Sequence, residues 1–455
     1  MKTALALFGA CALAGCSVPL IQPDAAQAVA DHYSTSVPQG GVTVDVNWWS
    51  RIGDRQLTEV LSLSRTNSPD LRSAAASVMS ARAQAGQSRA DLFPSVTGTA
   101  SATATETELE GRSNSRSAAL DASWEVDLFG KLRNSARAET TRARAEEVSY
   151  AGSYVSLAAE VANDYVDYRA CKLAEAEYRD ALASQQETVT ATGSLVNAGM
   201  SASSDLSLAR ANVASAEISL TTQRADCKVA AQSLTKVVGV SQGQIDATLA
   251  KGGGLPATKH FRVASVPADM LRQRPDVIEA EKRFAATLLD LKVAQAGLYP
   301  ALDLSGSVTH SDSKSWSFGP ALSLPILDGG ESRAKVRVAN ADALIAAESY
   351  RSTVLTAVAE VEGALTRLEA ARANLTSAES LVQQYQAYFN AVDEDWKAGG
   401  VSLLDREDAR RQVQSARITR ISQRKELLVQ WITLYKAVGG GWVPSAPAVP
   451  SQIES

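Results

Sequence analysis

The chain has 455 residues, with 45 Lys or Arg against 50 Asp or Glu, and therefore a formal charge of −5. This balance argues against a nucleic acid or another polyanion as the partner. Only 3 His are present, and they lie far apart in the sequence, which disfavours a His-based metal centre and a Ser-His-Asp hydrolase. The composition therefore points away from an enzyme, and no metal or cofactor is expected.

Residues 1–15 are predicted to be a secretory signal, because Lys2 precedes an apolar stretch too short to span a bilayer. The signal ends at Leu13-Ala14-Gly15-Cys16, which resembles the lipobox of bacterial lipoproteins. The resemblance implies a covalent lipid on Cys16 and, since Ser17 rather than Asp follows, sorting to the outer membrane. An ordinary signal with a chance cysteine is the alternative. The rest of the chain has no run of 18 apolar residues, so strands would have to make any membrane crossing.

The mature chain is predicted to contain two copies of one unit. Ser68-Pro69-Asp70-Leu71 corresponds to Arg274-Pro275-Asp276-Val277 at an offset of 206 residues, and Ala209-Arg210 corresponds to Ala409-Arg410 at an offset of 200. A change of loop length would explain the difference. We expect a lipidated extended segment over 16–53, a first unit over 54–262, a second over 263–442 and a Pro-rich tail over 443–455.

Each unit is predicted to begin with a helix, at roughly 54–90 and 267–297, followed by a β-hairpin at about 94–129 and 301–327. The strands would have about 9–12 residues with almost no charge, which is long enough to cross a bilayer at a tilt. The polar segments 106–116 and 309–314 are expected to be loops. Four strands cannot close a barrel, so several chains would contribute strands: two would leave a filled interior and three a channel. Soluble hairpins packed on helices are the alternative.

A very long helix is predicted after each hairpin, because no Pro occurs between Pro94 and Pro256 or between Pro325 and Pro444. Each helix would reach on the order of 100 Å at 1.5 Å per residue. Turns near Gly199 and Gly399 would fold these helices back into hairpins over about 131–238 and 331–438. In the first long helix, apolar residues follow one another at steps of three and four, the spacing that is typical of a coiled coil. They are Val148, Ala151, Val155, Ala158, Ala162 and Tyr165.

Two cysteines remain in the mature chain after Cys16. Cys171 lies 28 residues before Gly199 and Cys227 lies 28 residues after it. An antiparallel hairpin turning at this glycine places them side by side. We therefore expect a disulfide where the geometry permits it, with two buried free thiols as the alternative.

Several stretches, taken in order, resemble the TolC-like outer-membrane efflux factors, and in particular the lipoprotein branch that serves pumps of the resistance–nodulation–division (RND) class. They are Asn47-Trp48-Trp49, Gly53-Asp54-Arg55-Gln56-Leu57, Ser123-Trp124-Glu125-Val126-Asp127-Leu128-Phe129-Gly130-Lys131, Val266-Pro267-Ala268-Asp269-Met270-Leu271-Arg272-Gln273-Arg274-Pro275-Asp276-Val277, Leu324-Pro325-Ile326-Leu327-Asp328-Gly329-Gly330 and Leu434-Tyr435-Lys436-Ala437-Val438-Gly439-Gly440-Gly441-Trp442.

This resemblance implies an α+β membrane protein that works as a homotrimer. Each chain would give four strands to a twelve-stranded β-barrel in the outer membrane and its helical hairpins to an α-barrel tunnel through the periplasm. Conduction would be passive, because the energy would come from an inner-membrane RND transporter joined through a periplasmic adaptor, the membrane fusion protein. The substrate is not indicated.

The resemblance also implies a gate at the periplasmic turns. Asp405 and Asp408 lie three residues apart and so share a helix face, and they match the acidic residues that form the constriction in TolC-like channels. In a trimer, such a ring would favour cations and make closure sensitive to pH and divalent ions. The alternative is that these carboxylates stabilise a helix start, with Ser402 as the cap. The match is weaker for Asp408.

Adaptor tips dock on the helical turns in this family. Here those turns carry Gly199, Ser201, Gly399 and Ser402, whose small size would allow close contact; ordinary turn chemistry is the alternative.

Other functions explain less of the sequence. An envelope-spanning structural lipoprotein accounts for the helices but not for the charge-poor hairpins, and a protein-secretion channel would share the fold and differ in cargo. A hydrolase would need a base with a partner, and none is evident for His32, His260 or His310. The sequence therefore predicts the outer-membrane channel of a tripartite small-molecule efflux pump, anchored by lipid and extending into the periplasm.

Overall fold

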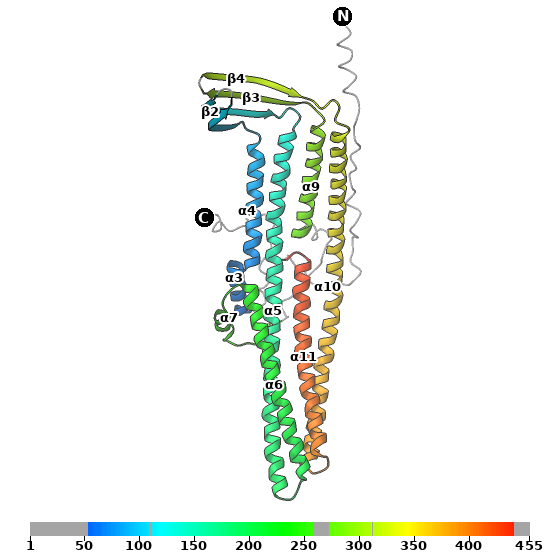
Figure 1. The fold of residues 1–455 in the computed structure, drawn as a ribbon. Coiled ribbons are helices and arrows are strands. Elements are labelled where there is room, and N and C mark those ends of the chain that lie inside the picture. Colours follow the sequence, from blue (N-terminus) through cyan, green and yellow to red (C-terminus); the bar gives the residue numbers. More distant parts are fainter. Residues whose placement is uncertain (1–52, 109–110, 258–272, 312, 441–455) are drawn as a thin grey trace.

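The computed structural model describes residues 53–108, 111–257, 273–311 and 313–440. Two long helical hairpins stand side by side, and a β-sheet projects from one end of the bundle (Figure 1). Cys16, His32, the stretch 47–49, His260 and the tail 443–455 lie outside the described residues. None of the helices within these ranges combines the length and apolar content needed to cross a membrane.

The first predicted helix is in fact two helices, α3 (Arg55–Asn67) and α4 (Pro69–Ala90). They separate at Ser68, whose ψ of 124° is not helical, because proline disfavours the helical conformation in the preceding residue. The corresponding helix α9 (Pro275–Ala296) also has a proline in its first turn. A short helix that was not predicted, α7 (Gln242–Leu249), follows the first hairpin.

The long helices agree with the prediction. Helices α5 (Lys131–Asn197) and α10 (Glu331–Lys397) each have 67 residues and therefore extend on the order of 100 Å. Helices α6 (Ser203–Val238) and α11 (Leu403–Ala437) return antiparallel to them. All six residues of the predicted coiled-coil stripe on α5 are buried, because α4, α6, α9 and α11 pack around this helix.

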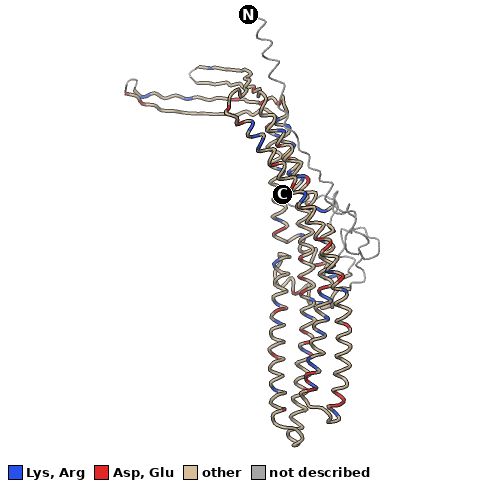
Figure 2. Tube along the Cα trace, turned by 90° about the vertical axis from the view of Figure 1, so that its right-hand side faces the viewer, with Lys and Arg blue, Asp and Glu red and all other residues tan. Residues whose placement is uncertain are grey.

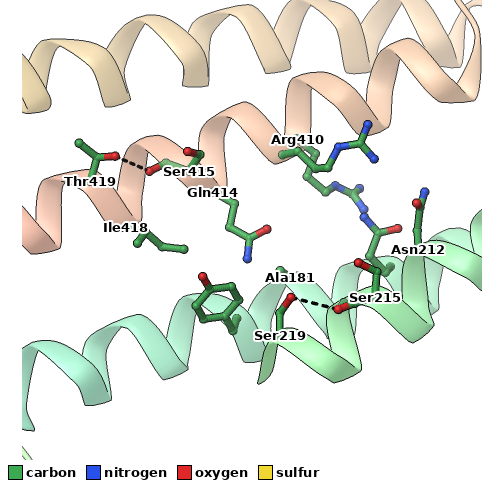
Figure 3. Close-up of a pocket in the computed structure, with 13 residues that line it drawn as sticks. Ala181, Asn212, Ser215, Ser219, Arg410, Gln414, Ser415, Ile418 and Thr419 are labelled. Atoms are coloured by element: carbon green, nitrogen blue, oxygen red, sulfur yellow. Dashed lines mark hydrogen bonds between the residues drawn. The ribbon is translucent and has the colours of Figure 1, made fainter. Parts of the chain in front are cut away.

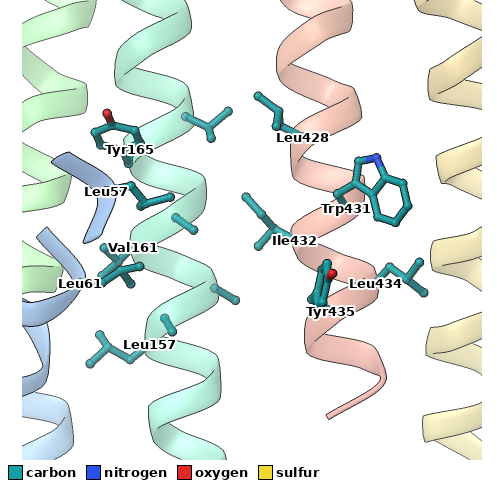
Figure 4. Close-up of a cluster of buried hydrophobic side chains, with 14 of the residues drawn as sticks. Leu57, Leu61, Leu157, Val161, Tyr165, Leu428, Trp431, Ile432, Leu434 and Tyr435 are labelled. Carbon is teal, nitrogen blue, oxygen red and sulfur yellow. The ribbon is translucent and has the colours of Figure 1, made fainter. Parts of the chain in front are cut away.

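The main apolar core lies at mid-height and joins the two hairpins. Figure 4 shows Leu57 of α3 beside Tyr165 of α5, with Leu428 and Ile432 of α11 facing them. The buried Tyr165 hydroxyl donates a hydrogen bond of 2.8 Å to the carboxylate of Asp54, which caps the start of α3. This residue therefore fixes α3 against α5 with both apolar contact and a satisfied polar group.

Arg274 makes the corresponding connection in the second half of the chain. Its guanidinium is buried, donates 2.6 Å to the carbonyl oxygen of Ala437 at the end of α11, and lies 2.7 Å from the carboxylate of Glu360 in α10. These charge-assisted bonds join the start of α9 to both helices of the second hairpin.

Asp164 on α5 gives the bundle a pH-dependent stability. Burial, followed by repulsion from Glu160 and Asp167, raises the pKa of Asp164 to about 6. Because the folded carboxyl group holds its proton more tightly than it does in the unfolded chain, stability is lost as the pH rises through this range. We expect Asp164→Asn to raise the melting temperature at pH 8 but not at pH 4, measured by circular dichroism. The exposed Asp180→Asn on the same helix is the control; equal shifts in both variants would contradict this assignment.

The sheet is antiparallel with strand order β1-β2-β3-β4. Its strands are β1 (Ser95–Thr107), β2 (Gly111–Val126), β3 (Ala301–His310) and β4 (Lys314–Ser323). The prediction of loops at 106–116 and 309–314 is wrong for most of these residues, which extend the strands. Ladder hydrogen bonds join backbone groups whatever the side-chain polarity, so polar residues such as Thr105 and Ser113 pair here. The predicted fourth strand ends early, at Ser323, two residues before Pro325.

The two faces of the sheet differ in chemistry. Gly98, Leu120, Val308 and Trp316 form one row across all four strands, and the last three side chains are exposed. The opposite face carries hydroxyl groups, with cross-strand hydrogen bonds of 2.8 Å between Ser101 and Ser117 and 2.9 Å between Ser307 and Ser317. Figure 2 shows few charges along the strands compared with the helices. One face is thus apolar and the other is polar.

Candidate functional site

The tips of the two helical hairpins lie together at the end of the bundle opposite the sheet (Figure 1). Gly199 and Gly399 follow α5 and α10 with φ of 70° and 78°, a left-handed conformation that only glycine adopts readily. The N–H groups of Met200 and Gly400 each donate 2.8 Å to carbonyl oxygens five residues earlier, the Schellman pattern that ends a helix. The sequence therefore places both turns correctly.

The two tips differ in how the return helix begins. In the second tip, Ser402 and Asp405 form a reciprocal capping box: the Asp405 N–H donates 3.2 Å to the Ser402 hydroxyl, and the Ser402 N–H donates 3.0 Å to the Asp405 carboxylate. In the first tip Ala202 occupies the cap position, and the hydroxyl of Ser201 donates 2.6 Å to Asp205 instead. Asp405 thus caps α11 and is also exposed at the tip.

The Asp405 carboxyl group keeps its negative charge to a lower pH than an ordinary aspartate. Hydrogen bonds from the side chain and then the backbone of Ser402 lower the pKa of this carboxyl group. They oppose the rise that neighbouring carboxylates would cause in an assembly of several chains. Asp408, one turn further along, is in an ion pair with Arg411, so its charge is partly neutralised within the chain.

A buried carboxylate that the sequence analysis missed lies next to this tip. Glu407 is only 1% exposed and is held by two side chains of α5: Gln185 Nε2 donates 2.6 Å and Thr188 Oγ1 donates 3.3 Å. Arg406 and Arg410 lie 3.0 and 3.4 Å from it. We call this group the interhairpin cluster; it consists of Gln185, Thr188, Arg406, Glu407 and Arg410. It joins the second hairpin to the first.

Arg406 extends the interhairpin cluster to α10. Its guanidinium is in an ion pair with Asp393 and lies 4.6 Å from the ring centroid of Trp396, a cation–π distance. Burial would raise the pKa of Asp393, but the hydrogen bonds from Lys397 and Arg406 outweigh it and lower this pKa. In the sequence, this cluster is indicated only by the aromatic residue Trp396 and by the i, i+3 spacing of Glu407 and Arg410.

A polar cleft of about 370 Å³ continues from the interhairpin cluster between α5, α6 and α11. In Figure 3, Gln414 extends from α11 toward Ala181 on α5, with Asn212 and Ser215 of α6 alongside. The two hairpins therefore face each other here across an open space lined by polar side chains together with Ala181 and Ile418. Polar contacts of this kind can exchange with water when helices separate.

Cys171 and Cys227 are joined between α5 and α6, with Cα atoms 5.5 Å apart. Closing a loop of 56 residues stabilises a fold by about 2 to 4 kcal/mol. We expect the double variant Cys171→Ser with Cys227→Ser to melt at a lower temperature in circular dichroism. Reductant should lower the melting temperature of the wild type and leave the double variant unchanged. Identical melting curves for the wild type and the variant would show that the bond contributes nothing.

Within the described ranges, no group of three or more His, Cys, Asp or Glu side chains is arranged to hold a metal ion. Cys16, the predicted lipidation site, lies outside these ranges.

The chain matches known proteins over most of its length. The family model described as "Outer membrane efflux protein" matches residues 60–240 and 266–440. Nodulation protein T of Rhizobium leguminosarum bv. viciae is 30% identical over 436 residues, covering 93% of this chain and 90% of that protein. The toluene efflux pump outer membrane protein TtgC of Pseudomonas putida is 29% identical, covering 94% of this chain and 93% of that protein.

The fold has a solved counterpart. The structure of the outer-membrane channel OprN aligns with a TM-score of 0.81 and 29% identity, covering 93% of this chain and all of that one. The resemblance predicted from the sequence motifs is therefore confirmed, as is the combination of long helical hairpins with a four-stranded sheet. The chain belongs to the outer membrane efflux protein family.

Proposed function

We propose that this chain forms, as a homotrimer, the outer-membrane channel of a tripartite efflux pump for small molecules. The observation that supports this most directly is the sheet. Its edge strands β1 and β4 are unpaired within the described chain, and one of its faces is apolar while the other carries hydroxyl groups. Open edges are not tolerated in lipid, so further copies of the chain must complete the sheet.

Three copies satisfy these requirements better than two. Eight strands would enclose an interior filled by side chains, whereas twelve leave a channel. In such a barrel the apolar face contacts lipid and the hydroxyl face lines the channel. Asp121 and Asp303 lie on the hydroxyl face and give the channel a preference for cations.

The remaining parts fit a passive channel. A lipid on Cys16 anchors the mature N-terminus, and the two units 54–262 and 263–442 arise by duplication. The helical hairpins extend into the periplasm, where Gly199, Ser201, Gly399 and Ser402 contact the adaptor that joins the channel to an inner-membrane RND transporter. We assign the protein no catalytic activity.

The periplasmic end acts as the gate. Three copies of Asp405, with Asp408 on the next turn, form an acidic ring, and the interhairpin cluster holds each second hairpin against the first. Opening requires this cluster to exchange its contacts.

Single-channel recording in planar bilayers tests the proposal. The purified full-length protein should run as a trimer and give discrete openings that select cations over anions in a salt gradient. Correctly folded, membrane-inserted trimers that never conduct, even with the Asp405→Asn or the Glu407→Ala substitution, would overturn the proposal. A purified protein that remains monomeric and fails to insert into the bilayer would also overturn the proposal.

A further inference from the structure

A cluster of basic side chains lies on the same face of the sheet as the apolar row. Because side chains alternate between faces, residues two apart along a strand share a face. Along β3, His310 follows Val308 on that face, and His310 pairs directly with Lys314 of β4 and with Ala118 of β2. Arg116 lies two residues beyond Ala118 on the same face, at a diagonal position from His310. Arg116, His310 and Lys314, called the cationic cluster, therefore lie together.

The side chains of the cationic cluster are exposed in the single chain. All three side chains are exposed, and no ion pair to Arg116 or Lys314 occurs among the residues that the structure describes. Asp121 of β2 and Asp303 of β3 lie on the opposite face. Glu106 shares the face but pairs with Arg112, four residues further from the helices than Arg116.

Next to the cationic cluster is an apolar surface of the kind that lipid chains contact. Trp316, two residues from Lys314 on the same face, is 80% exposed, and Val308 and Leu120 are exposed beside it. Tryptophan is enriched where hydrocarbon meets headgroups. Val308 and Trp316 lie two residues from the ends of β3 and β4 that are far from the helices, and Figure 2 shows the strands projecting away from the bundle.

We propose that the cationic cluster binds the anionic headgroup of an acylated glycolipid in the outer leaflet, such as a phosphorylated diglucosamine, while Trp316, Val308 and Leu120 contact its acyl chains. Arginine binds phosphate oxygens in a bidentate manner and lysine contributes a point charge, and the His310 ring offers a further N–H donor. The assignment rests on the proposed outer-membrane barrel, in which the helices point to the periplasm and these strand ends to the exterior.

Binding of a defined lipid to the purified full-length trimer tests the proposal. The probe is bisphosphorylated lipid A in detergent, compared with the same lipid after removal of its phosphates, with native mass spectrometry as the readout. The test variant is Arg116→Gln with Lys314→Gln. The matched control is Arg210→Gln with Lys228→Gln, which removes two exposed cations from α6 and so changes the net charge equally.

We expect the test variant to bind bisphosphorylated lipid A about 30-fold more weakly than the wild type, from the usual attraction of two cations near a charged lipid surface. The control should bind like the wild type, and the phosphate-free lipid should bind weakly to every variant. Equal affinity of test variant and wild type, or of the two lipids, would overturn the proposal. Displacement of the lipid by low millimolar inorganic phosphate would also overturn it, in favour of a free-phosphate site.

Single variants and conductance measurements distinguish failure of the lipid site from failure of the proposed barrel. If the double variant does not form a trimer, the single variants should each lose about fivefold in affinity. Conductance in bilayers of uncharged phosphatidylcholine separates this proposal from the proposed function. Channels that conduct normally but show no preference for the phosphorylated lipid would refute the lipid site alone, whereas absence of insertion would refute the barrel itself.

Discussion

Removing the charge of Asp405 should open the channel. We expect Asp405→Asn to increase the mean current in planar bilayers severalfold and to weaken block by divalent cations. Three carboxylates at a constriction attract and retain cations there, and the asparagine oxygen can still accept the Ser402 N–H bond that caps α11. Asp405→Ala should have a larger effect, because it also removes the capping interaction, which contributes about 1 kcal/mol.

The control for this prediction is Asp205→Asn in the first tip. Asp205 is the counterpart of Asp405 but accepts its hydrogen bond from Ser201 rather than forming a capping box. We expect its conductance and divalent block to remain those of the wild type. Equal effects of the two asparagine variants would mean that any loss of tip charge loosens the turns, and that Asp405 is not the gate.

Loss of the Glu407 carboxylate should destabilise the periplasmic end and uncouple the two hairpins. Glu407→Ala leaves Arg406 and Arg410 in a mostly buried place without their shared partner and is expected to cost about 3 to 5 kcal/mol, the usual penalty for removing one partner of a buried ion pair. The melting temperature should fall, and proteolysis near the second tip should become faster. Because Gln185 and Thr188 of α5 also lose their acceptor, the channel should open more often.

Two variants test whether this effect belongs to the interhairpin cluster. Glu407→Gln keeps an oxygen that can accept a hydrogen bond but removes the charge, so its effect should be intermediate. Glu348→Ala removes an exposed carboxylate that lies 3.8 Å from Arg351 within the same helix, and such surface pairs contribute about 0 to 1 kcal/mol. A melting temperature of Glu407→Ala equal to that of Glu348→Ala would contradict the proposed connection between hairpins.

The local features of this protein could be predicted from its sequence because they depend on neighbours in the chain. The absence of proline over long stretches allowed two helices of 67 residues each, and Gly199 and Gly399 marked the turns. The equal spacing of Cys171 and Cys227 from the first turn placed them opposite each other. Pro69 should have indicated the break between α3 and α4, since its effect on Ser68 is equally local.

The parts that could not be predicted depend on contacts between elements. Polar residues such as Ser113 read as a loop, yet they belong to a strand because a partner strand satisfies their backbone groups. Glu407 lies between Arg406 and Asp408 in a highly charged segment, so its sequence context suggests an exposed residue. Its burial depends on how α11 is rotated and shifted against α5 and α10. Sequence periodicity specifies which side chains share a helix face, but the rotation and axial register between helices arise only when their surfaces pack. The sequence by itself therefore determined the helices, the turns and the alternating faces of the strands, whereas the tertiary structure decided which charges are buried and which hairpins they join.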